Sequence, residues 1–198
     1  MNYKEIFGII ALGLSFIGYI PYFRDIFKKK TKPHVFSWLA WSFIGGIVFF
    51  AQLIEGAGAG AWVVGLGSII CIAIAILAVF QGEKAITKSD WVAFIGALLG
   101  LTLWRLTNNP LLAIVLVTIT DALAFIPSFR KAYHKPFEET LITWFFSSSK
   151  YIFALIATES YSLATVLYPA SLVLSNGSFW LMLLVRRQRL NKQKANYV

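Results

Sequence analysis

Two ionisable residues lie deep inside apolar stretches of this sequence, where a charge is costly. Asp121 and Lys150 stand on either side of a polar loop, each about fourteen residues from its centre. If both stretches are antiparallel membrane helices, a rise of ~1.5 Å per residue brings the two residues to one depth, far from either surface. The sequence therefore predicts an intramembrane charge pair, which either only locks the two helices together or serves a substrate or a proton.

A candidate substrate-binding set consists of five residues in apolar stretches: Asn176, Trp180, Ser148, Trp144 and Ser15. Asn176 lies one helical turn before Trp180, and its amide can both donate and accept hydrogen bonds, which suits a hydroxyl-bearing or amide-bearing ligand. The alternative for Asn176 and the serines is hydrogen bonding between helices, which is common in membrane bundles. Trp144 is either a pocket residue or an anchor at the membrane interface.

The sequence offers no support for an enzyme. It contains no nucleophile–base pair, no metal-ligand cluster and no phosphate-binding glycine loop. His34 and His134 lie in polar loops without further metal ligands around them. We therefore expect no catalytic residue, no metal and no cofactor. The single cysteine, Cys71, excludes an intrachain disulfide and is expected to serve as a packing residue.

The elements that carry these residues are apolar stretches of membrane-spanning length. The chain is 58% hydrophobic, and its mean hydropathy is +0.70, far above that of a soluble domain. A spanning helix needs ~20 apolar residues. Seven stretches approach this length: Ile6–Phe23, Val35–Ile54, Ala61–Phe80, Trp91–Trp104, Leu111–Phe129, Thr140–Ala157 and Leu163–Val185. The sequence predicts an all-α integral membrane protein with seven transmembrane helices, of which Trp91–Trp104 is the shortest.

Positive charge is distributed unequally between the two sides of these stretches. The first, third and fifth gaps and the C-terminal tail hold fifteen lysines and arginines, whereas the N-terminus and the even gaps hold two. By the positive-inside rule, the N-terminus is outside and the C-terminus is cytoplasmic. The formal charge of +9 is then explained by membrane lipids as partners, including anionic lipids of the cytoplasmic leaflet, and no nucleic-acid partner is expected.

The sequence also repeats itself after 106 residues without a gap. The shift aligns seven identical pairs: Pro21 with Pro127, Phe23 with Phe129, Arg24 with Arg130, Lys29 with Lys135, Trp38 with Trp144, Ser42 with Ser148 and Ala51 with Ala157. It also aligns Ser15 with Asp121. Proline removes a backbone hydrogen bond inside a helix and kinks it. Pro21 and Pro127 are therefore expected to act as a symmetric pair of hinges, or else as fixed kinks.

The repeat and the charge distribution together predict the domain organisation. Residues 1–82 form a first three-helix unit and residues 110–185 a second, while residues 83–109 contain a linker helix and residues 186–198 a basic cytoplasmic tail. A unit of three helices ends on the opposite side from its start, so the linker helix returns the chain and the two units run parallel. In such a 3+1+3 arrangement the substrate path lies between the units, near the bilayer midplane.

The segments 18–38 and 124–136 resemble the helix–basic loop–helix signature of the PQ-loop/SWEET superfamily of membrane proteins. The family's helix proline corresponds to Pro21 and Pro127, and the residue after it is Tyr22 or Ser128 in place of the family's glutamine. The resemblance implies a transporter of a small polar solute of the sugar, amino-acid or nucleoside class that works by alternating access. It also implies a substrate-binding role for Asn176. The alternative is a non-transporting receptor on the same scaffold.

Overall fold

The computed structural model describes residues 2–107 and 110–195. Within these residues the chain forms seven α-helices, two 3-10 helices and no strand. The α-helices are α1 (Tyr3–Phe27), α2 (Val35–Ile54), α3 (Trp62–Gln81), α4 (Lys88–Leu106), α5 (Pro110–His134), α6 (Leu141–Ala157) and α7 (Leu163–Ala195), and the 3-10 helices are η1 (Gly58–Ala61) and η2 (Pro136–Glu138). Residues 108–109 of the predicted linker and 196–198 of the predicted tail lie outside this description.

Four of these helices are long and apolar enough to cross a membrane. They are α1, α2, the continuous segment Gly58–Gln81 and the segment Leu163–Gln193, while α6 is a shorter apolar helix. Large apolar side chains face outward from them, and Phe50, Phe80 and Leu174 are 66%, 73% and 73% exposed. Such a surface is unfavourable in water but suits lipid. The fold is therefore that of a helical integral membrane protein.

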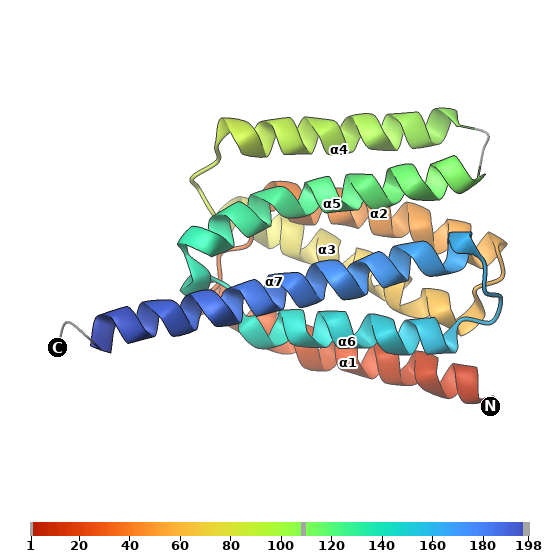
Figure 1. Ribbon diagram of the computed structural model, residues 1–198, viewed down its shortest axis with the longest axis horizontal. Coiled ribbons are helices and arrows are strands. Elements are labelled where there is room, and N and C mark those ends of the chain that lie inside the picture. Colours follow the sequence, from red (N-terminus) through yellow and green to blue (C-terminus); the bar gives the residue numbers. More distant parts are fainter. Residues whose placement is uncertain (1, 108–109, 196–198) are drawn as a thin grey trace.

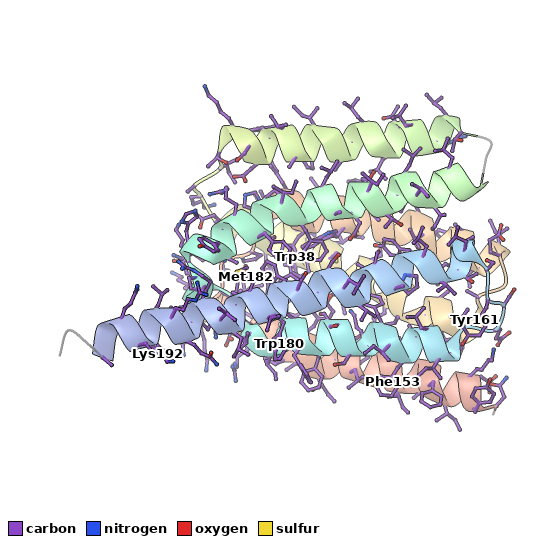
Figure 2. All side chains as sticks on the ribbon, in the orientation of Figure 1. Trp38, Phe153, Tyr161, Trp180, Met182 and Lys192 are labelled. Atoms are coloured by element: carbon purple, nitrogen blue, oxygen red, sulfur yellow. The ribbon has the colours of Figure 1, made fainter. Side chains whose placement is uncertain are left out.

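Each predicted apolar stretch coincides with one α-helix, and the largest difference is at the C-terminus. Helix α7 does not end at Val185 but continues to Ala195. The additional residues are mostly arginine, lysine, glutamine and leucine, which favour helix even without packing. This part of α7, with Lys192, extends beyond the other helices (Figure 2).

Consecutive helices run in opposite directions, so the loops gather at two ends of the bundle (Figure 1). One end holds the α1–α2, α3–α4 and α5–α6 loops and the extension of α7; we call it the basic end, because most lysines and arginines lie there. The other end holds the N-terminus and the loops that follow α2, α4 and α6. The basic end is the one that the charge distribution predicts to be cytoplasmic.

Packing does not follow the chain order. Helix α3 packs against both α1 and α2, and α7 packs in the same way against both α5 and α6. Because the third helix of each group lies between the first two, α1 has no extensive contact with α2, nor α5 with α6. The two groups meet where α1 packs on α6 and α2 packs on α5. Helix α4 lies at one edge, mainly against α5 (Figure 1).

A hydrogen-bonded network attaches α4 to the basic end. Arg130 donates from Nε to Oδ1 of Asp90 at 2.7 Å and from Nη2 to Oδ2 at 2.6 Å. His34 Nε2 lies 3.3 Å from the same carboxylate, and Lys135 donates to Glu83 at 2.8 Å. Burial alone would raise the pKa of Glu83, but hydrogen bonds from Lys135 and a backbone amide lower this pKa to about 2. Both carboxylates are thus held in their charged form.

Close packing of α1 on α6 depends on a glycine. A β-carbon at Gly18 would lie 2.9 Å from the β-carbon of Phe146, whereas one at Gly13 would meet nothing within 4 Å. We expect Gly18→Ala to lower the free energy of unfolding by about 1–3 kcal/mol through overpacking. Gly13→Ala, on the same helix, should raise it by up to ~1 kcal/mol through helix propensity. Thermal unfolding in detergent measures both, and equal responses would show that α1 does not approach α6 this closely.

Candidate solute-binding cavity

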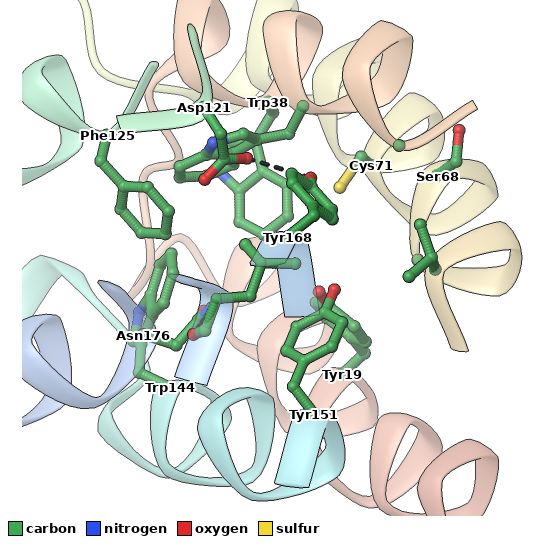
Figure 3. Close-up of a pocket in the computed structure, with 15 residues that line it drawn as sticks. Tyr19, Trp38, Ser68, Cys71, Asp121, Phe125, Trp144, Tyr151, Tyr168 and Asn176 are labelled. Carbon is green, nitrogen blue, oxygen red and sulfur yellow. Dashed lines mark hydrogen bonds between the residues drawn. The ribbon is translucent and has the colours of Figure 1, made fainter. Parts of the chain in front are cut away.

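A cavity lies in the middle of the bundle. It is lined by fifteen residues contributed by every α-helix except α4. All fifteen are buried in the bundle. Its volume is about 40 Å³, which is room for roughly two or three water molecules. Figure 3 shows the side chains that surround it.

Aromatic rings fill the side of the cavity nearest the basic end. Trp41 packs on Phe125 with ring centroids 4.4 Å apart, and Trp144 packs on Phe179 at 4.2 Å. Trp38 completes this aromatic layer, 6.1 Å from Trp144. Such pairs add ~0.5–1.5 kcal/mol each beyond the burial of their area. Because these tryptophans come from the first two turns of α2 and the first turn of α6, the layer lies between the cavity and the basic end.

A buried polar cluster lies on the side of the aromatic layer that faces the basic end. Glu139 is 3% exposed and accepts hydrogen bonds from Lys131 at 2.8 Å, Trp144 Nε1 at 3.3 Å and the Tyr22 hydroxyl at 3.4 Å. Arg187 of α7 donates to the backbone oxygens of Pro136 and Glu139. We call these groups the Glu139 cluster. It joins α1, α5, α6 and α7 at the basic end.

The polar groups of the cavity include one carboxylate. Asp121 of α5 is 1% exposed and accepts a hydrogen bond from the Tyr168 hydroxyl of α7 at 3.1 Å. Asn176 donates to the backbone oxygen of Leu172 at 2.8 Å. The indole N–H of Trp41 is buried and has no hydrogen-bond partner among the described residues. These groups can bind a ligand that supplies both a donor and an acceptor.

Lys150 does not form the predicted ion pair with Asp121. Its ammonium donates to the Tyr19 hydroxyl at 3.3 Å and lies 4.5 Å and 4.9 Å from the ring centroids of Tyr19 and Tyr151. No carboxylate among the described residues lies within 4 Å of it. The prediction assumed that α5 and α6 are neighbours because they are consecutive, but α7 lies between them. Asp121 and Lys150 are therefore two separate buried ionisable groups.

Only two of the five residues in the predicted substrate-binding set line the cavity. Asn176 and Trp144 line the cavity, whereas Ser148, Trp180 and Ser15 do not. Ser148 donates to the backbone oxygen of Val173 in the α6–α7 interface, Trp180 packs on Phe145, and Ser15 donates to Ala11 of its own helix.

Half of the twelve cavity residues that the prediction did not include are aromatic. They are Tyr19, Trp38, Trp41, Phe125, Tyr151 and Tyr168. The sequence contains a signal for some cavity residues, since Tyr168, Leu172 and Asn176 recur every four residues on one face of α7. Aromatic residues are so frequent in this chain, at 16%, that the same spacing also fits lipid-facing positions.

The two predicted hinge prolines lie inside helices, Pro21 in α1 and Pro127 in α5. Thr143 of α6 donates to the backbone oxygen of Gly18, one turn before Pro21, at 2.7 Å. Side-chain hydroxyls commonly satisfy carbonyls near a helix proline in membrane proteins. Ser37, the repeat equivalent of Thr143, is buried and has no hydrogen-bond partner within residues 2–107 and 110–195.

Fold and cavity together define a helical protein with several candidate membrane spans around a cavity that is lined by seven aromatic residues, one carboxylate and one amide among others. Comparison of the chain with protein-family models, with curated proteins and with solved structures found no match.

Proposed function

We propose that this protein is a membrane transporter of a small polar solute that works by alternating access. The observation that carries the proposal is the cavity in the middle of the bundle, which is lined by aromatic rings together with one carboxylate and one amide and to which α1–α3 and α5–α7 both contribute. A solute site near the bilayer midplane, between two helical units, is the arrangement found in many secondary transporters. The resemblance of the two loop segments to the PQ-loop/SWEET superfamily points in the same direction.

We further propose that the two groups of helices are repeated units in a 3+1+3 arrangement, with all seven α-helices spanning the membrane. Residues related by a twofold axis approach each other only near that axis. Two pairs separated by 106 positions do so: the rings of Trp38 and Trp144 are 6.1 Å apart, and Lys32 donates to Glu138 at 2.7 Å. These contacts support an axis that runs from the basic end into the cavity.

In this proposal the basic end is cytoplasmic and forms the inner gate. The aromatic layer and the Glu139 cluster hold this gate closed in the present state. Pro21 and Pro127, in the same half of their helices, provide the hinges about which α1 and α5 bend when it opens. Opening requires the cluster to separate, because its members lie on four different segments that must move apart.

Uptake into proteoliposomes tests the proposal. Vesicles with the purified protein are incubated with a mixed pool of sugars, amino acids, amines and nucleosides, and mass spectrometry identifies what accumulates inside. We expect at least one solute to enter, and Asn176→Ala to reduce its uptake at least tenfold, because the variant removes the cavity's amide. The matched control is Asn191→Ala, at an exposed position of the same helix.

The folded yield of both variants should equal that of the unmodified protein. Binding without accumulation inside the vesicles would instead identify a receptor on this scaffold. Undiminished uptake by Asn176→Ala would assign Asn176 to helix packing.

A further inference from the structure

Asp121 is a buried carboxylate that no cation of the described chain neutralises. It is 1% exposed, and its one hydrogen bond from a described residue is the neutral hydroxyl of Tyr168. It takes part in none of the ion pairs among the described residues, and the ammonium of Lys150 is directed to Tyr19. This carboxylate contrasts with Glu139, which has Lys131 at 2.8 Å.

A charged carboxylate in such surroundings requires a partner. A buried charge in a membrane protein is strongly unfavourable unless it is paired, and such residues commonly lie at substrate or ion pathways. The protein leaves one direction from which a partner can come, because Asp121 lines the cavity. The missing positive charge is therefore expected to arrive with the cavity's occupant.

The walls of the cavity are also suited to a cation. Seven of the fifteen lining residues are aromatic, and the faces of aromatic rings attract ammonium groups. Figure 3 shows the carboxylate of Asp121 and the rings of Phe125, Trp144 and Tyr168 around the same space. A neutral sugar would use the rings but would leave Asp121 without a counter-charge.

We propose that the cavity binds a solute that bears a positively charged amino group, which pairs with Asp121 against the aromatic walls. This inference rests on the proposed function and specifies its substrate class. The solute also carries an oxygen that accepts a hydrogen bond, because the indole N–H of Trp41 is buried without an acceptor in the part of the chain that the structure describes. Amino alcohols and amino acids share this chemistry.

Matched pairs of small compounds test the inference on the intact purified protein. Ethanolamine and ethylene glycol differ in one amino group, and so do L-alanine and L-lactate. We expect at least one amine to raise the melting temperature by about 5 °C at concentrations far above its Kd, and its partner without the amino group to have no effect. A response to ethanolamine alone identifies a simple amine, whereas a response to L-alanine alone identifies an amino acid.

Variants then assign the effect to Asp121. Asp121→Asn should abolish the response to amines, and Asp121→Glu should retain part of it. Thr118→Val, on the same helix, should respond like the unmodified protein, because Thr118 only donates to the backbone oxygen of Ile114. Equal responses to both members of each pair, or a full response in Asp121→Asn, would overturn the inference. If Asp121→Asn does not fold, the matched pairs decide the question with the unmodified protein.

The same compounds separate this inference from the proposed function. Uptake of neutral sugars only, with no response to amines, overturns the amine inference and leaves the transporter proposal standing. An amine-specific increase in melting temperature without uptake of any solute supports the ligand class and overturns transport. If no solute is taken up and no amine raises the melting temperature, both the amine inference and the transporter proposal are overturned.

Discussion

Glu139→Gln lowers the free energy of unfolding by about 3–5 kcal/mol, the usual effect of removing one partner of a buried ion pair. The variant leaves the ammonium of Lys131, which is 1% exposed, without its counter-charge. It also weakens the hydrogen bonds from Tyr22 and Trp144. For a chain of this size the loss corresponds to a decrease of roughly 10 °C in melting temperature, which thermal unfolding in detergent measures.

The adjacent residue provides the control. Glu138 also pairs with a lysine at 2.7 Å, but the side chains of Lys32 and Glu138 are 41% and 28% exposed. Exposed pairs contribute ~0–1 kcal/mol, so Glu138→Gln should change the melting temperature little. The double variant Lys131→Met/Glu139→Gln should recover much of the loss, because the unpaired charge is gone. Equal losses for Glu138→Gln and Glu139→Gln would contradict the assignment of Glu139 as the centre of the buried cluster.

The positions of the helices were predictable from the sequence because they depend on local composition. The predicted stretch Val35–Ile54 has the same bounds as α2, and the others differ mainly where charged residues continue a helix into water. The packing order was not predictable in this way. Short loops suggest that consecutive helices are neighbours, but the insertion of α3 and α7 between their predecessors depends on contacts across the whole bundle.

The residues of the cavity were predicted only in part, because they also depend on how the helices pack. Polarity identified Asn176 and Asp121 as residues of the bundle interior, and the repeat singled out Trp144; all three line the cavity. It also selected Ser148 and Ser15, whose hydroxyls satisfy backbone oxygens instead. Polarity shows that a residue avoids lipid, but only the rotation of each helix decides whether it faces a neighbouring helix or the cavity.

Lys150→Met raises the free energy of unfolding by about 1–3 kcal/mol, because it removes a charge that the protein does not neutralise. A charge at this depth is unfavourable by at least ~2.5 kcal/mol. The hydrogen bond from Lys150 to Tyr19 and the contacts of its ammonium with the rings of Tyr19 and Tyr151 offset only part of this. Methionine has a similar length and fills the same space between Tyr19 and Tyr151. The melting temperature in detergent should therefore increase.

Lys131→Met is the matched control, because both lysines are buried and both become methionine. Lys131 has a carboxylate partner at 2.8 Å, so its replacement leaves Glu139 unpaired and should lower stability by about 3–5 kcal/mol. The two variants are thus expected to have opposite signs. A double variant with Asp121→Asn should show additive effects within about 0.5 kcal/mol, since Lys150 and Asp121 share no partner. A loss in Lys150→Met that Asp121→Asn reverses would instead mean that the two charges stabilise each other across the cavity without touching.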